Sequence, residues 1–396
     1  MKNKIKLLNK IASCGTDVFD KDRYEIGEDI TDPDAIMVRS AVMHDMELGA
    51  NLKAVARAGA GVNNIPLEKC AENGIVVFNT PGANANGVKE LVICGMLLAC
   101  RDVVGGIEWV KTIAGDENTA KLVEKGKSAF AGTELAGKTL GIIGLGAIGG
   151  PLANAAVAMG MDVIGFDPYM SVDAAWKISR SVKKVGSREE IFAQADFISL
   201  HVPLIENSDP KVNTKHMINA ETISMMKDGV ILLNFARDAL ADDDAVEAAL
   251  ESGKIRKYVT DFPNARTSVM KGVIAIPHLG ASTEESEDNC AVMAANELID
   301  YLETGNIKNS VNYPSVELPY HDNGGQRLVI LHRNIPNMIS HISTSLSSRN
   351  INIENLANRS KGNYACTLVD TLTHIDDDTV KSVGDMEGII RVIKIG

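Results

Sequence analysis

A glycine-rich turn, Gly144-Leu-Gly-Ala-Ile-Gly149, constrains this chain more than any other feature. It follows a short apolar run and precedes a helix-compatible one. The first glycine permits a tight turn, the second lets backbone amides approach a pyrophosphate, and the third allows a helix to pack closely on a strand. Asp167 ends the next apolar run, where its carboxylate can accept hydrogen bonds from ribose hydroxyls and would repel a 2′-phosphate. A purely structural turn is the alternative. Strand, helix and acid in register favour an NAD site made of Gly144, Gly146, Ala147, Ile148, Gly149 and Asp167.

The segment around this turn predicts a doubly wound sheet. Strands that are covered on both faces read as continuous apolar runs, and helical segments between them imply parallel pairing. Val230-Ile-Leu-Leu is one such run, and 241–252 is one such helical segment. The six predicted strands are 139–144, 161–167, 195–203, 229–236, 257–262 and 272–277.

The flanking regions predict further domains. Residues 1–90 alternate short apolar runs with helical stretches, which is typical of a small α/β unit, and 283–302 has the apolar stripe of an amphipathic helix. A polar segment with Pro and Gly follows at 309–326 and is interpreted as a linker. The last 70 or so residues read βαββαβ, a ferredoxin-like order. Their predicted elements are strand 327–331, helix 336–349, strands 351–359 and 364–372, helix 376–386 and strand 389–395.

Composition excludes several classes of function. The 396 residues carry a formal charge of −12, which argues against nucleic acid and anionic membranes as partners. No apolar run reaches the length of roughly 20 residues that spans a bilayer, and the N-terminus does not resemble a signal peptide. The six cysteines show neither a CxxC pair nor metal-ligand spacing, so we expect no metal site and a reducing, cytoplasmic location.

Three further segments are predicted at the carboxyl ends of strands, where open sheets bind ligands. They are Leu200–Pro203, Asn234–Arg237 and Pro277–Thr283. With Val38-Arg-Ser40, Arg57–Gly61, Asn79-Thr-Pro81 and the glycine turn, they occur in an order that closely resembles the D-2-hydroxyacid dehydrogenases over essentially the whole chain. The resemblance implies a Rossmann domain at 91–282, inserted in a smaller flavodoxin-like substrate domain made of 1–90 and 283–308.

The resemblance also assigns roles around the predicted cofactor site. Hydride transfer needs a group that exchanges the hydroxyl proton and a cation that binds the substrate carboxylate, and His278 and Arg237 match the family residues with these roles. Arg237 paired only with Asp242 or Asp243 is the structural alternative. The positions matching those that line NAD are Val202, Pro203, Phe235, Ala236, Asp261, Gly280 and Ala281.

One departure from the family concerns the catalytic histidine. Members usually carry a Glu a few residues after the position of Asp261, and that Glu hydrogen-bonds the histidine. This chain reads Thr260-Asp-Phe-Pro-Asn-Ala-Arg266, without it. Either Asp261, Glu284 or Glu285 orients His278, or the imidazole works alone. We expect proton transfer to survive with a displaced pH–rate profile.

The substrate domain carries residues that suit an anion. Arg39, Ser40 and Arg57 match residues that contact a phosphorylated hydroxy acid in some family members, and forked Arg donors suit phosphate and carboxylate. Ala60 and Gly61 form a turn whose amides could face the substrate carboxylate. The resemblance implies oxidation of 3-phospho-D-glycerate to 3-phosphohydroxypyruvate, the first step of L-serine biosynthesis. Alternatives are a glyoxylate or hydroxypyruvate reductase, or an NAD-sensing protein with little turnover.

The C-terminal module at 327–396 resembles an ACT domain, a small amino-acid-binding unit of biosynthetic enzymes. The match lies in Leu331–Pro336 and in Asn350–Ile353. In serine-regulated relatives, the residues that match His332, Asn334 and Asn352 hold L-serine at a dimer interface. The resemblance therefore implies a homodimer or homotetramer inhibited by serine, with a module that serves only oligomerisation as the alternative.

Overall fold

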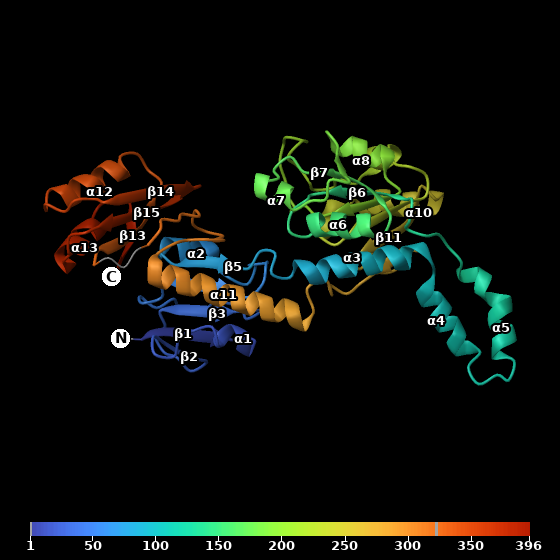
Figure 1. The fold of residues 1–396 in the computed structure, drawn as a ribbon, viewed down its shortest axis with the longest axis horizontal. Helices are drawn as coiled ribbons and strands as arrows, with labels where there is room; N and C mark the ends of the chain where they lie inside the picture. Colours follow the sequence, from blue (N-terminus) through green and yellow to red (C-terminus); the bar gives the residue numbers. More distant parts are fainter. Residues whose placement is uncertain (1, 321–323) are drawn as a thin grey trace. The chain divides into compact units, whose positions relative to one another are not determined.

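The computed structural model describes residues 2–320 and 324–396. The chain divides into two compact units, one formed by 1–84 with 284–396 and the other by 85–283 (Figure 1). Within the described residues, no helix is both long enough and apolar enough to cross a bilayer.

The first unit begins with a five-stranded parallel sheet in the order β2-β1-β3-β4-β5. This is the flavodoxin-like strand order, which confirms the fold expected for the substrate domain. Its strands are buried because they are short apolar runs such as Ala35–Val38 and Ala54–Arg57. The elements are β1 Asn3–Leu8, α1 Ser13–Thr16, β2 Tyr24–Gly27, β3 Ala35–Val38, β4 Ala54–Arg57, α2 Leu67–Glu72, β5 Val76–Asn79 and the long helix α11 Glu284–Thr304.

The second unit is a seven-stranded parallel sheet in the order β12-β11-β10-β9-β6-β7-β8. The order runs outward in both directions from β6, which places the glycine turn at the point where the sheet reverses. All six predicted strands are present, and a seventh, β8, was not predicted. The strands are β6 Thr139–Ile143, β7 Asp162–Phe166, β8 Val182–Lys184, β9 Phe197–Leu200, β10 Val230–Asn234, β11 Ile255–Thr260 and β12 Val273–Ala275.

Most helices of this unit cover its sheet, and two of them project away from it. Figure 1 shows α4 and α5 projecting as an arm from the end of α3. The arm is held together by Trp109 and Phe130, whose ring centroids lie 5.4 Å apart. The helices are α3 Ala85–Cys100, α4 Val103–Thr112, α5 Thr119–Gly126, η1 Lys127–Phe130, α6 Gly149–Ala158, α7 Val172–Trp176, α8 Arg188–Gln194, α9 Ala220–Ser224, η2 Asp238–Leu240 and α10 Asp243–Ser252.

The C-terminal module of the first unit is a four-stranded antiparallel sheet in the order β14-β15-β13-β16. With two helices it has the ferredoxin-like βαββαβ order that the sequence predicts. Its elements are β13 Gln326–Arg333, α12 Met338–Ser347, β14 Asn355–Lys361, β15 Tyr364–Thr371, α13 Asp377–Gly384 and β16 Ile389–Ile395.

The two faces of this antiparallel sheet are both buried. Leu328 and Ile330 on β13 pack with the helices of the module, whereas the alternate residues Val329 and Leu331 join the core of the five-stranded sheet. Side chains alternate between the faces of a strand, so one strand contributes to two cores. The module is therefore packed on the substrate domain rather than tethered to it.

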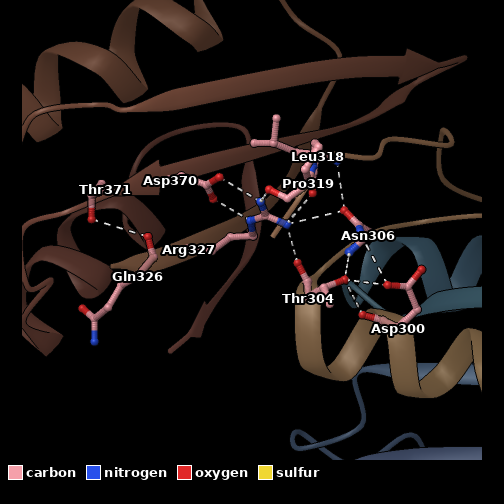
Figure 2. Close-up of polar contacts among 9 residues, drawn as sticks. All are labelled: Asp300, Thr304, Asn306, Leu318, Pro319, Gln326, Arg327, Asp370 and Thr371. Carbon is pink, nitrogen blue, oxygen red and sulfur yellow. Dashed lines mark hydrogen bonds and ion pairs between the residues drawn. The ribbon is translucent and has the colours of Figure 1, made fainter. Parts of the chain in front are cut away.

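A buried arginine joins the module to the segment before it (Figure 2). The Arg327 guanidinium pairs with Asp370 through Nε–Oδ1 at 2.5 Å and Nη2–Oδ2 at 2.8 Å. It also donates to the carbonyls of Thr304, Leu318 and Pro319 at 2.8, 3.0 and 3.1 Å. The segment predicted as a linker is thus held at one end by Arg327.

The rest of that segment is packed as well. Tyr313 is buried, and its hydroxyl donates to the Ala71 carbonyl. The Asn312 amide accepts from Val77 N and donates to Ile75 O, which extends the hydrogen bonding of β5 through a side chain. The stretch interpreted as a linker is therefore more than a polar connection, since Tyr313 and Val316 lie in the core of the first unit and Leu318 packs against it.

Candidate active site

The glycine turn has the geometry that a dinucleotide needs. Gly144 has a φ of +92°, and a Cβ on it would lie 2.4 Å from the His201 carbonyl oxygen. A Cβ on Gly149 would lie 2.0 Å from the Gly144 carbonyl oxygen, so helix α6 can start only if this residue is glycine. A Cβ on Gly146 would meet nothing within 4 Å. The first and third glycines therefore build the turn, and the second leaves it open to a ligand, which fits a pyrophosphate.

Asp167 follows β7 and supports the same turn. Its Oδ2 accepts from Leu145 N at 2.8 Å, and its Oδ1 accepts from Tyr169 N at 2.9 Å. The carboxylate is thus fixed beside the glycine turn, at the carboxyl edge of the sheet. Each oxygen retains a lone pair for a further donor, as ribose hydroxyls would be. Ala147 is exposed and Ile148 half-buried at the start of α6.

The residues after β9 and β10 lie at this edge too. Val202 packs against the glycine turn, with Cγ1 3.0 Å from the position of a Gly144 Cβ, and Pro203 is exposed. Phe235 is buried, because its ring packs against Gly95 of α3. A contact of Phe235 with NAD would therefore come from its backbone.

Arg237 and His278 contact the same aromatic ring. The Arg237 guanidinium lies 5.7 Å from the centroid of Phe262, and the His278 ring lies 4.6 Å from it. His278 is exposed and has a φ of +53°, in the left-handed region that few side chains adopt. A cation and an imidazole on one apolar platform are the pair that oxidation of a hydroxy acid requires.

The loop that carries His278 is held by Asp261. Its Oδ1 accepts from Leu279 N at 2.8 Å, and its Oδ2 accepts from Gly280 N at 2.9 Å. Burial raises the pKa of Asp261, while these two amides and the charge of His278 oppose that rise. Asp261 thus fixes the backbone of the loop, including Gly280 and the adjoining Ala281.

Asn264 stands in the shortened loop that lacks the family glutamate. Its amide donates to Asp243 Oδ2 at 2.8 Å and to Asp238 Oδ1 at 3.1 Å, which ties the loop to the helical turn after Arg237. Asp242 meanwhile caps α10 by accepting from Ala245 N. Both carboxylates that could have neutralised Arg237 therefore have other partners, and Arg237 donates to the Ala236 carbonyl.

The predicted substrate residues of the first unit lie at neighbouring strand ends. Val38 and Arg57 are opposite one another in β3 and β4, and Arg57 Nε donates to the Arg39 carbonyl at 3.1 Å. The Arg57 side chain lies over Gly59, where a Cβ would come within 1.9 Å of Nη1. Asn9 accepts from the amides of Ser40 and Ala41. Ala60 is exposed, and a Cβ on Gly61 would meet nothing within 4 Å.

Two residues of α11 face these arginines. Glu287 forms an ion pair with Arg39. Cys290 is buried, and burial raises the pKa of its thiol, while the charges of Arg57 and Arg39 oppose the rise and Glu287 adds to it. The pKa of Arg57 is lowered by burial and by the charge of Arg39, while Cys290 opposes this change. These effects place two guanidiniums, one thiol and one carboxylate in a single cluster.

The residues predicted to hold an effector lie on the C-terminal module. His332 is 2% exposed, and its Nδ1 donates to the Arg333 carbonyl at 2.8 Å while Nε2 lies 2.9 Å from Thr367 Oγ1. Asn334 Nδ2 donates to the Gly362 carbonyl at 3.0 Å, and Asn352 is exposed. His332 is thus committed to hydrogen bonds inside the module, whereas the two asparagines keep free hydrogen-bonding capacity.

Relatives of known activity match most of the chain. The family description "D-isomer specific 2-hydroxyacid dehydrogenase, NAD binding domain" matches residues 94–280. A D-3-phosphoglycerate dehydrogenase of Haemophilus influenzae is 32% identical over 93% of this chain and 88% of its own length. A hydroxypyruvate reductase of Thermotoga maritima is 38% identical over 71% of this chain and 89% of its own length. The chain belongs to the D-2-hydroxyacid dehydrogenase family.

Other comparisons agree on the family and cofactor. A D-3-phosphoglycerate dehydrogenase of Methanocaldococcus jannaschii is 38% identical over 74% of this chain, which spans only 54% of that relative's length. The solved structure of an NAD⁺-bound 3-phosphoglycerate dehydrogenase of Entamoeba histolytica is similar with a TM-score of 0.60, at 28% identity, over 79% of this chain and 99% of the other. The cofactor of this family member is NAD, as the acidic residue after β7 predicts.

Several residues at these sites were not identified from the sequence. Phe262, the ring shared by Arg237 and His278, ends a predicted strand and was given no role in the site. Asn264, Glu287 and Asn9 act through hydrogen bonds or ion pairs to segments far away in the chain. An available signal was the Asp261-Phe262 pair, since an aromatic residue directly after a buried acid at a strand end is well placed to line a site.

Proposed function

We propose that this chain oxidises 3-phospho-D-glycerate to 3-phosphohydroxypyruvate with NAD, as the first step of L-serine biosynthesis. The observation that carries the proposal is the approach of Arg237 and His278 to one ring, that of Phe262, in the unit that contains the NAD turn. Relatives named for this activity, one matching 93% of the chain, support the choice of substrate.

The chemistry divides between these residues. Arg237 binds the substrate carboxylate and polarises the carbonyl that develops at C2. His278 accepts the proton of the C2 hydroxyl, while the hydrogen on C2 leaves with its electron pair. Bound NAD supplies the acceptor for that hydride at C4 of its nicotinamide. Arg39 and Arg57 supply two further cations, which favours a substrate that carries a phosphate as well as a carboxylate.

One assay tests the activity and its alternatives. We expect NADH to form from 3-phosphoglycerate with a specificity constant at least about tenfold above those of glycerate and D-lactate, a difference of about 1.4 kcal/mol in transition-state binding. Equal constants would refute the phosphate assignment. A preference for glyoxylate or hydroxypyruvate with NADH would favour the reductase function of the Thermotoga maritima relative. Tight NAD binding without turnover of any of these acids would indicate a sensor.

Self-association is the second part of the proposal. On α4 the side chains of Val104 and Ile107 are 54% and 52% exposed, and Val103 and Val110 are also exposed. Val103, Ile107 and Val110 line an apolar hollow of about 460 Å³ on the projecting arm, together with Trp109 and Phe130. Exposed apolar patches of this kind mark protein interfaces. We expect a homodimer or homotetramer through this arm, and Ile107→Asp should shift the mass measured by light scattering toward the monomer.

Regulation by L-serine is the third part. The C-terminal module presents Asn334 and Asn352 with amide groups that suit the carboxylate and ammonium of an amino acid. The proposal places serine there, with His332 supporting the strand beneath. Saturating serine should inhibit 3-phosphoglycerate oxidation and Asn352→Ala should weaken that inhibition; activity unchanged by serine would refute it. The six free cysteines fit the cytoplasm as its location.

A further inference from the structure

The ion pair between Arg39 and Glu287 occupies a group that the proposed substrate would need. Arg39 follows β3, and Glu287 lies in the first turn of α11. The Arg39 side chain is 46% exposed, and that of Glu287 is 42% exposed. Both can therefore exchange their partners with solvent ions. The backbone around Arg39 is fixed, because Asn9 and Asn64 bind the peptide groups of Ser40 and Ala41. The guanidinium is thus anchored at its base and free to change partner at its tip.

The rest of the cluster shows what Glu287 neutralises. Arg57 is half-buried, its Nε donates to the Arg39 carbonyl, and burial together with the charge of Arg39 lowers its pKa. The buried Cys290 thiol is a neutral neighbour at ordinary pH, since burial raises its pKa. Glu287 is therefore a carboxylate that balances one of two adjacent cations.

We propose that Glu287 is a resident counter-ion of Arg39, which the phosphate of the substrate displaces and which thereby sets how strongly anions bind to this cluster. The inference rests on the proposed function for the identity of the substrate, but not for the exchange itself. The displaced carboxylate remains on α11 near the bound anion and repels a dianion more than a monoanion. Glu287 is a specificity-determining residue and takes no part in proton or hydride transfer.

The size of the effect follows from the exposure of the pair. Exposed ion pairs contribute about 0.2–1 kcal/mol, so removing Glu287 should strengthen anion binding by about 1.4- to 5-fold. Screening by salt should reduce the gain, since the Debye length falls to about 3 Å at 1 M salt. A residue that only stabilised α11 would weaken binding when replaced, and its effect would not depend on salt in this way.

The direct test uses Glu287→Gln in the full chain with inorganic phosphate as the probe. Titration calorimetry should show phosphate binding about 1.4- to 5-fold tighter than in wild type, with the difference shrinking at about 1 M salt. Glu47→Gln removes the same charge from an exposed position in the same unit and should leave the affinity unchanged. Unchanged or weaker phosphate binding by Glu287→Gln would overturn the proposal.

Steady-state kinetics separate this inference from the proposed function. With 3-phosphoglycerate, Glu287→Gln should lower KM by a similar factor while kcat changes little, and the fall in KM should be smaller for glycerate. A higher KM, or an equal fall for both acids, would contradict the role of Glu287. If neither protein oxidises 3-phosphoglycerate but phosphate binding still tightens, the proposed function fails and the counter-ion stands.

Discussion

The proposed chemistry depends on individual side chains, and one of them, His278, has an unusual backbone conformation. Its positive φ restricts which side chains can replace it without strain, because few residues other than Asn, Asp and Gly accept the left-handed region. Its loop is fixed from below by Asp261 through two backbone amides. Position and backbone are therefore set independently of the imidazole, which allows the side chain to be tested alone.

We predict that His278→Asn keeps the fold and loses the chemistry. Asn tolerates the left-handed backbone, so the hydrogen bonds of Asp261 should persist, but Asn cannot accept the hydroxyl proton. The value of kcat should fall by about 10²–10⁴-fold. NAD affinity, measured by protein fluorescence, serves as the control and should stay within about two-fold of wild type. A variant with near-normal kcat would exclude His278 as the base.

Glu297 gives a prediction about pH at the same scale. It lies on α11 with 7% exposure, its Oε1 accepts from Asn309 Nδ2 at 2.7 Å, and burial raises its pKa from 4.5 to about 7. The folded state therefore binds more protons than the unfolded state between these two values. The stability from this shift is complete below pH 4.5 and is lost as pH rises through 7.

Glu297→Gln should remove this loss. Gln keeps an oxygen for Asn309 and carries no charge, so the variant should be more stable than wild type at pH 8 by about 1–3 kcal/mol and about equal at pH 4. Urea unfolding at both pH values measures the difference. Glu303→Gln on the same helix should not reproduce this pH-dependent gain. A constant difference between wild type and Glu297→Gln across pH would contradict burial of the charge as the cause.

At the scale of elements, the glycine turn separates structural from ligand-binding demands. A Cβ on Gly149 would collide with the Gly144 carbonyl at 2.0 Å, whereas a Cβ on Gly146 would meet open space within 4 Å. Gly149→Ala should therefore destabilise the unit by about 1–3 kcal/mol. Gly146→Ala should keep the melting temperature and weaken NAD binding by about tenfold, as expected for a lost hydrogen bond to a charged group. Equal loss of Tm in both variants would contradict this division.

Sequence patterns predicted the elements of the second sheet well because its strands are continuous apolar runs. The one strand missed, β8, has two exposed lysines in three residues, and such an edge strand leaves no apolar signal. The arm of α4 and α5 was missed for the opposite reason. Its apolar side chains suggest burial, and only the structure shows that they face outward in the single chain.

The sites show the same limit. The glycine turn could be predicted because Gly144 and Gly149, which are close in sequence, are also in contact in space. Glu287 could not, since its partner Arg39 is 248 positions away and an acid in the first turn of a helix is common for other reasons. Asn312 was not predicted for a similar reason. Its side-chain amide makes hydrogen bonds at β5 that a neighbouring strand would otherwise make, but in the sequence it resembles any loop asparagine.

At the scale of the whole molecule, the C-terminal module and the substrate domain share one hydrophobic core. Val329 and Leu331 of β13 lie with Phe78 and Tyr301 in that core, and Arg391 of β16 donates to the carbonyl of Gly74. An effector bound to such a module would act on the substrate domain through direct packing. It also follows that the two parts should unfold together.

Arg327 tests this cooperativity, because it is 0% exposed and binds Asp370 together with the carbonyls of Thr304 and Leu318. Arg327→Met leaves the Asp370 carboxylate without its buried partner and should lower the free energy of unfolding by about 3–5 kcal/mol. Adding Asp370→Asn should restore part of that loss by removing the unpaired charge, whereas Arg349→Met at an exposed position should change little. Urea unfolding should show the first unit in one transition, followed through tyrosine fluorescence, for wild type and variants alike. A separate early transition of the C-terminal module in wild type would show that the shared core does not couple the two parts.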